Sequence, residues 1–343
     1  MARQDGTAET DQAVPSPPEP DPPAGDPELR LRRLRRNAVT VWAVALTVFI
    51  IVRGIPLERF IQTLWILLGL FAVNAGRPWR SQLRILVDWI PFVGFLWLYD
   101  LTRGIALDFG RPTHVTQPLD AEKWLFHGTV PTQWLQSHFY DPAHAHWYDI
   151  VVSLTYFSHF IVVWVYAAVL YVRERHRWGQ WARRILMLSY AGMITYVLYP
   201  AAPPWFAQQY YGLIPGVSRI ATRGWDVLHL HTAAALIAKA QGGANDVAAI
   251  PSLHAAFTAM LTAFVWPRLG WVGRVLMVLY TLAMAGALVY GGEHYVVDAL
   301  IGYAYVAVVL VVAAWWERMR ARQRAARAAV AAPEQAAAAA AAP

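Results

Sequence analysis

Residues 294–316, HYVVDALIGYAYVAVVLVVAAWW, decide the fold of this chain. As a helix, the stretch is long enough to cross the hydrocarbon core of a bilayer, which is roughly 30 Å thick. Its side chains are apolar or aromatic except for His294 and Asp298, which lie near its start. The stretch therefore predicts a membrane-spanning helix that carries two polar, ionisable side chains at one end.

Seven further apolar blocks precede this one. Together they give candidate spans at 38–54, 60–76, 84–102, 147–172, 183–200, 251–266, 271–291 and 294–316. The composition agrees, because 57% of the 343 residues are hydrophobic and only 15% are charged, which is less charge than a soluble chain usually carries. We expect an all-α fold, a polytopic transmembrane bundle of about eight spans.

The composition also excludes several classes of site and partner. The chain has no cysteine, so disulfides, thiol catalysis and zinc–thiolate sites are excluded. The net charge of +7 does not indicate a nucleic-acid partner, because the basic residues flank the apolar blocks. That distribution is typical of membrane topology.

Counting basic residues in alternate loops predicts the orientation. One set of loops and ends holds 20 lysine and arginine residues and the other holds eight. The basic-rich side of a membrane protein is usually cytoplasmic. We therefore expect an integral plasma membrane protein with both termini in the cytoplasm and two long outward loops, 103–146 and 201–250. Residues 225–239 could form an amphipathic helix in the interface.

The first candidate site is the pair His294 and Asp298. A spacing of four places both side chains on one face of a helix. The carboxylate can accept the N–H of one imidazole nitrogen and leave the other nitrogen free to act as a nucleophile or base. Ionisable residues inside spans are costly and usually functional, and Gly291 and Gly292 allow a sharp turn just before the pair. The alternative is a satisfied polar pair inside the bundle.

The second candidate is the string Pro251-Ser252-Leu253-His254, at the start of the sixth span. Proline suits a first helical position, and the N–H groups of the first turn form an anion site. Ser252 adds a hydroxyl donor, and His254 follows one turn into the helix. Only one span separates this string from the other candidate, so both must lie on the same side of the membrane. The charge count places that side outside.

The two candidates together predict phosphoryl transfer. Two helix N-termini, two imidazoles and a carboxylate could converge on one phosphate. Asp298 would orient His294 as the nucleophile that attacks phosphorus. His254 would be the general acid and base, protonating the leaving oxygen and later deprotonating the acceptor.

At these residues the chain resembles the type 2 phosphatidic acid phosphatase superfamily, which carries a Pro-Ser-Gly-His string and a Ser-Arg-x5-His-x3-Asp string. The matching residues are Pro251, Ser252, His254, His294 and Asp298. The departures are Leu253 for the glycine, Ala287 and Leu288 for the Ser-Arg pair, and Gly104 for the lysine of a Lys-x6-Arg-Pro string that ends at Arg111-Pro112.

The departures resemble one branch, the inositol phosphotransferases that include fungal inositol phosphorylceramide synthase. The similarity lies in Tyr199-Pro200-Ala201-Ala202-Pro203-Pro204-Trp205 and in the outer loop from Asp120 to Gln136. It covers roughly residues 85–312. The resemblance implies a six-helix phosphatase-like core that transfers a phosphoinositol head group from phosphatidylinositol to a lipid alcohol, with no metal or other cofactor.

Other cations must replace the missing arginine of the family. Arg103 is the first candidate for binding the phosphate, followed by Arg219, Arg223 and Lys123, and Ser252 could add a hydrogen bond. The alternative for Arg103 is a helix-end charge that reaches the interface. A metal cluster is not expected from the histidines of the outer region, since no carboxylates accompany them in a ligand pattern. These histidines are His114, His127, His138, His144, His146 and His159.

The expected organisation is therefore a disordered cytoplasmic tail at 1–36, a transmembrane catalytic domain at 37–318 and an Ala/Arg-rich cytoplasmic tail at 319–343. The expected partners are a phospholipid donor, a lipid acceptor and the bilayer. Two alternatives stay open. A lipid phosphate phosphatase acting on phosphatidic or polyprenyl phosphates would use the same three residues with water, and a non-catalytic lipid transporter or scaffold would fit polar residues within spans.

Overall fold

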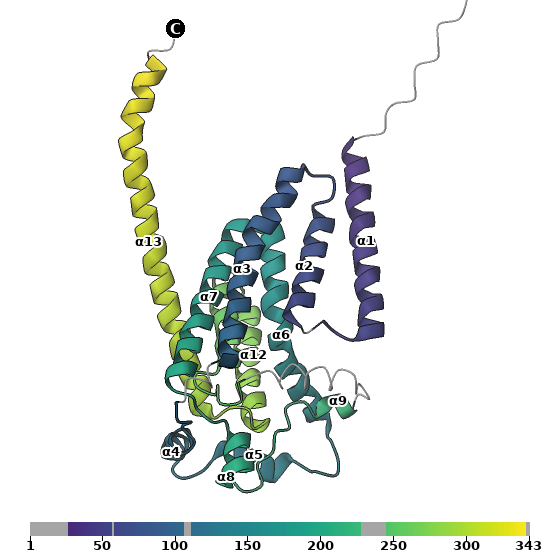
Figure 1. Ribbon diagram of the computed structural model, residues 1–343, viewed down its shortest axis with the longest axis vertical. Helices are drawn as coiled ribbons and strands as arrows, with labels where there is room; N and C mark the ends of the chain where they lie inside the picture. The colour runs from purple at the N-terminus through teal and green to yellow at the C-terminus, as the bar shows by residue number, and fades with distance from the viewer. Residues whose placement is uncertain (1–26, 57, 106–110, 228–244, 341–343) are drawn as a thin grey trace, which may run out of the picture.

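The computed structural model describes residues 27–56, 58–105, 111–227 and 245–340, and within these it describes no side chains for 100–105, Asp226 or 330–340. Eight long helices run back and forth between two ends of the molecule (Figure 1). They are α1 (Pro27–Arg53), α2 (Arg59–Val73), α3 (Trp79–Ile105), α6 (Trp147–Arg173), α7 (Arg175–Leu198), α11 (Leu253–Val265), α12 (Trp271–Tyr290) and α13 (Val296–Ala340). The all-α bundle is thus confirmed, and the described residues contain no strand, only isolated bridges at Ala201.

Five of these helices are long and apolar enough to cross a membrane: α1, α3, α6, α12 and α13. The other three match predicted spans in position but fall short in length or hydropathy. Helix α2 has 15 residues and α11 has 13. Helix α7 has 24 residues, but its first half carries four arginines. The protein is an integral membrane protein, and many large apolar side chains of the long helices lie on the outside of the bundle.

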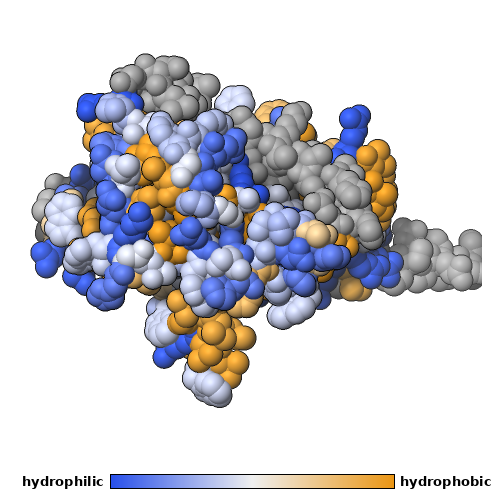
Figure 2. Space-filling view, turned by 90° about the horizontal axis from the view of Figure 1, so that it is seen from below, coloured by the Kyte–Doolittle hydropathy of each residue, from blue (hydrophilic) through white to orange (hydrophobic). Residues whose placement is uncertain are grey.

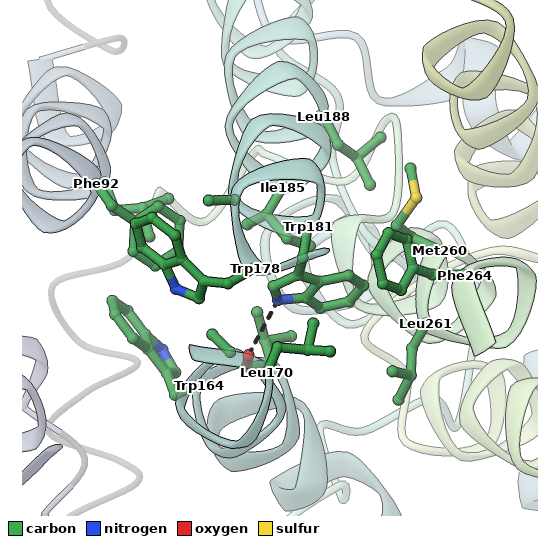
Figure 3. Packing of buried hydrophobic residues seen from close by; sticks show 14 of the residues in the cluster. Phe92, Trp164, Leu170, Trp178, Trp181, Ile185, Leu188, Met260, Leu261 and Phe264 are labelled. Carbon is green, nitrogen blue, oxygen red and sulfur yellow. Dashed lines mark hydrogen bonds between the residues drawn. The ribbon is translucent and has the colours of Figure 1, made fainter. Parts of the chain in front are cut away.

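Aromatic packing at the centre of the bundle holds α3, α6, α7 and α11 together. Trp89, Trp178 and Trp181 come from α3 and α7 and are almost entirely buried. Figure 3 shows Trp181 between the other helices, with its indole N–H donating to the Val163 carbonyl at 3.4 Å. Such large rings bury much apolar area and leave little freedom for helices to slide. This cluster is the rigid frame that supports the polar end.

Short helices gather at one end of the bundle, opposite the start of α1 and the end of α13 (Figure 1). They are α4 (Thr116–Leu125), α5 (Pro131–Phe139), α8 (Pro204–Tyr211) and α9 (Gly224–Val227). Hydrophilic side chains cover much of this end, with hydrophobic ones between them and at the edges (Figure 2). The expected amphipathic helix at 225–239 lies mostly outside the described residues.

Gln136 of α5 fixes this outer layer to the bundle. Its side-chain amide donates to the carbonyls of Ser218 at 2.9 Å and Tyr290 at 2.7 Å, and its carbonyl accepts from the Ser218 N–H at 2.8 Å. The side chain is almost fully buried, so these bonds are shielded from water. One residue therefore joins α5, the loop before α9 and the end of α12.

Candidate active site

The contact between His294 and Asp298 exists, but its local geometry differs from the predicted one. Helix α13 begins at Val296, so His294 precedes the helix and only Asp298 lies in its first turn. The prediction that both side chains share a helical face is wrong. His294 Nδ1 is 3.3 Å from Asp298 Oδ2, which also accepts the Tyr295 N–H at 2.9 Å. Since Asp298 has no exposed surface, this carboxylate fixes the imidazole and the helix start together.

The turn before His294 depends on Gly292, as the sequence predicted. Its φ of +75° is a left-handed conformation that glycine adopts without strain. A Cβ there would lie 2.6 Å from the Ser218 carbonyl oxygen. The Gly292 carbonyl accepts the Trp205 N–H at 3.1 Å. The start of α8 and the segment around Ser218 therefore hold this turn from two sides.

Ser252 is the N-cap of α11, and its hydroxyl accepts the Ala255 N–H at 3.4 Å. Pro251 therefore precedes the cap, and the prediction that it occupies the first helical position is wrong. An N-cap serine satisfies a helix-end donor, which explains the Pro-Ser pattern by local structure. Ser252 has no exposed surface and does not line the cavity described below, whereas His254 does.

Helices α11 and α13 touch closely at this cap. The Ser252 N–H donates to the Asp298 carbonyl at 3.0 Å. A Cβ on Gly302 would lie 2.6 Å from the Ser252 carbonyl oxygen. Because backbone cannot move aside as a flexible side chain can, Gly302 sets the distance between the helix that carries His254 and the helix that begins after His294.

We expect Gly302→Ala to lower both the melting temperature and the activity, because an overpacked contact costs about 1–3 kcal/mol and would push the two helix starts apart. Gly286→Ala in α12 is the matched control, since a Cβ there meets nothing within 4 Å. The control should be neutral or slightly stabilising. Thermal melting in detergent and initial rates check this, and equal behaviour of the two variants would contradict it.

The two histidines face each other across the helix starts. Their ring centroids are 5.8 Å apart, so the expectation from helix parity that both candidates lie on the same side is confirmed. Three rings of α6 contact His254: Tyr156 stacks on it at 5.1 Å, the His159 centroid is 4.0 Å away, and Phe160 meets it edge-on at 5.8 Å. His254 is therefore held in orientation by α6 as well as by its own helix.

Both histidines line a cavity of about 780 Å³. Its outer part is polar and includes Arg219, Glu293 and Asn245. The remaining wall is largely apolar and comes from the middle of the long helices; it includes Leu96, Phe160, Val163, Trp164, Ile185 and Phe257. A volume of this size with one polar and one apolar region suits a lipid whose head group lies at the histidines.

Of the predicted cations, Arg219 lies in this cavity. Its guanidinium forms a two-point ion pair with Glu293, at 2.8 and 3.1 Å, and stacks over Trp205 at 4.7 Å. Burial alone would lower the pKa of Arg219, but Glu293, with smaller contributions from Tyr156 and Asp246, raises it overall, so the side chain stays charged. Arg53 and Arg59, which were not predicted, also line the cavity.

The other predicted cations lie elsewhere. Arg223 donates to the Pro142 carbonyl at 3.2 Å and stacks over Tyr140. Lys123 is exposed on α4, and neither residue lines the cavity. The side chain of Arg103 lies outside the described residues. Of the outer histidines, His114 stacks on Tyr199 and His144 pairs with Asp141. Within the described residues, no three histidine or carboxylate side chains form a group that could hold a metal.

Sequence reasoning missed Glu122, which positions the start of α13. Its buried carboxylate accepts the N–H of Val296 at 3.0 Å and of Val297 at 3.1 Å. A carboxylate at a helix N-terminus satisfies free donors and complements the helix dipole. The only sequence signal was its place in the 120–136 string, whose resemblance marked the segment without giving Glu122 a role.

Comparison with known proteins agrees with this geometry. Residues 119–330 match the family model of the PAP2 superfamily. A relative from Bacteroides thetaiotaomicron, named phosphoinositol dihydroceramide synthase, is 27% identical over 254 residues, which cover 66% of this chain and 75% of the relative. No solved structure matches. The matched region contains all of α5 to α12 and both His254 and His294. The two matches together show that the chain is an enzyme of the phosphotransferase or lipid phosphatase type. We conclude that it belongs to the PAP2 superfamily.

Proposed function

We propose that this enzyme transfers a phosphoinositol head group from phosphatidylinositol to a lipid alcohol through a phosphohistidine intermediate. The observation that carries the proposal is the convergence of His254 and His294 on one cavity with a polar end and an apolar wall, with buried Asp298 behind His294. A free phosphate would not need the apolar wall, whereas a lipid that must lie with its phosphorus beside His294 would.

In the first step, His294 attacks the phosphorus of the donor. Because Asp298 engages Nδ1, the attacking atom is Nε2. A bond forms between Nε2 and phosphorus, and the bond from phosphorus to the diacylglycerol oxygen breaks. His254 donates a proton to that oxygen, so diacylglycerol leaves neutral.

In the second step, neutral His254 takes the proton of the acceptor hydroxyl. The acceptor oxygen attacks phosphorus, the bond to Nε2 breaks, and His294 returns to its starting state. Tyr156 and His159 keep the His254 ring aimed at the reacting oxygens in both steps. Positioning of this kind lowers the barrier because no reorganisation is needed at the moment of transfer.

The charge of the cavity supports transfer from a diester over hydrolysis of a monoester. The charged side chains that line it are Arg53, Arg59 and Arg219, and Glu58, Asp246 and Glu293. A phosphodiester carries one negative charge, whereas a phosphomonoester carries up to two near neutral pH. A cavity with balanced charge suits the diester better. The Bacteroides relative is named phosphoinositol dihydroceramide synthase, and dihydroceramide is a lipid alcohol.

We further propose a plasma membrane location and a catalytic domain at 37–318. The count of 20 basic residues against eight supports cytoplasmic termini and a site on the outer side. Both ends of the described chain lie opposite the short helices (Figure 1), which agrees with a single outer face.

The test uses the purified full chain in phosphatidylcholine vesicles that contain phosphatidylinositol and a fluorescent dihydroceramide. We expect a fluorescent phosphoinositol lipid and an equal amount of diacylglycerol. Phosphatidic acid vesicles are the parallel substrate for hydrolysis. Release of inorganic phosphate from phosphatidic acid, with no transfer from phosphatidylinositol, would contradict the proposal and establish the phosphatase.

A further inference from the structure

A cluster of polar side chains beside His294 has no part in the two steps above. Glu293, Asp246 and Arg219 all line the cavity. Glu293 forms the two-point ion pair with Arg219, and its side chain is 8% exposed. Asp246 lies at the exposed rim, where its charge also helps to raise the pKa of Arg219. These groups form one electrostatic unit at the polar end.

Asn245 adds an independent observation. Its side chain lines the same cavity, although the residue is only 7% exposed. Its amide oxygen accepts the Val247 N–H at 3.0 Å, but the amide nitrogen has no partner among the residues that the structure describes. A buried amide without a partner is unfavourable, so a ligand that accepts a hydrogen bond here gains binding energy.

Backbone contacts bring these residues together from three parts of the chain. The Ala201 N–H donates to the Val247 carbonyl at 2.7 Å, and the Ala249 N–H donates to the Ala201 carbonyl at 3.1 Å. Trp205 is bonded to the turn at Gly292, and its ring lies under Arg219. The segment at 245–249 and the turn that carries Glu293 are therefore both attached to residues 201–205, so the cluster is preorganised.

We propose that Glu293, Asp246 and Asn245 form a hydroxyl-binding site for the polyol head group that stays on phosphorus during transfer. The inference rests on the proposed function and names the residues that would select its donor. Glu293 is next to His294 in the chain, and a group attached to the phosphorus must lie near that imidazole. The two carboxylates accept hydrogen bonds from hydroxyl groups, and the Asn245 amide nitrogen donates to one. A site built to bind hydroxyls discriminates strongly against substrates that lack them.

Donor selectivity tests this site. Asn245→Ala, Asp246→Asn and Glu293→Gln are compared with Asp141→Asn, a carboxylate of the outer layer that bonds within its own loop. The measurement is kcat/KM for transfer from phosphatidylinositol and from phosphatidylglycerol in the same vesicles. The selectivity ratio is kcat/KM for phosphatidylinositol divided by kcat/KM for phosphatidylglycerol. We expect Asn245→Ala and Glu293→Gln to lower this ratio about tenfold, mainly by raising KM for phosphatidylinositol. The control variant should leave it unchanged. Asn245→Ala leaves the ion pair of Arg219 intact, so it decides the question if Glu293→Gln does not fold.

Binding of glycerophosphoinositol to the detergent-solubilised full chain separates this inference from the proposed function. Calorimetry should show binding to the wild type that Asn245→Ala weakens about tenfold. Binding that follows this pattern without lipid transfer would remove the proposed function and leave the site. Transfer with an unchanged selectivity ratio in all three variants would overturn the site and leave the function. Absence of both binding and transfer would overturn both.

Discussion

Transfer by the His294→Ala enzyme is expected to fall by about 10³-fold or more, the range seen when a covalent nucleophile is removed. The loss should lie in kcat, because the variant keeps the cavity in which we propose that the lipid binds. The measurement is product formation from phosphatidylinositol in vesicles, together with covalent labelling. A donor with ³²P in its phosphate should label the wild type after rapid quenching and leave the variant unlabelled.

His144→Ala is the control for this prediction. His144 is an outer-layer histidine whose partner, Asp141, lies in the same exposed loop. The His144→Ala enzyme should retain full activity and the melting temperature of the wild type. If His294→Ala folds like the wild type and still turns over lipid, then the three polar residues are structural, and a transporter or scaffold becomes the better account.

Glu122→Ala is expected to have the largest effect on stability outside the bundle core. The change removes the acceptor of two N–H groups at the start of α13, each worth about 1–3 kcal/mol when left buried and unpaired. The start of α13 also positions Asp298, so activity should fall together with the melting temperature. Glu122→Gln keeps the size and one acceptor oxygen and should show a smaller loss in both measurements.

Asp120→Asn is the matched control on the same helix, because Asp120 is exposed. It should behave as the wild type in thermal melting and in initial rate. A Glu122→Ala enzyme that melts normally would show that water or a shifted backbone satisfies the two donors, and the positioning role of α4 would then be wrong.

Local sequence patterns predicted the helices and the convergence of the two histidines well. Helix parity needed only one intervening span, and it correctly brought His254 and His294 to one side. The pattern at His294 and Asp298 gave the right contact for a wrong reason. A four-residue spacing on a helix and a carboxylate that folds back over its own helix start produce similar distances, and spacing alone cannot distinguish them.

Contacts between distant segments could not be predicted. Arg219 and Glu293 are 74 positions apart, and Glu122 and Val296 are 174 positions apart. Residues so far apart leave no local sequence pattern. They meet because the outer layer is held on the bundle by a few side chains such as Gln136, whose partners are also distant in the sequence. For the same reason, the sequence offered Arg219 only as one of several candidate cations, and it did not indicate that Arg53 and Arg59 also line the cavity.

The bonds of Gln136 also have a consequence for biogenesis. They link α5 to Tyr290, which is 154 residues later in the chain. A chain that emerges from its N-terminus first must leave α5 without these partners until α12 has been inserted. His294 and Asp298 follow only a few residues after that point. A half-inserted chain therefore lacks both the anchoring of α5 and the proposed nucleophile, so we expect no phosphoryl transfer before α12 and the start of α13 are in place.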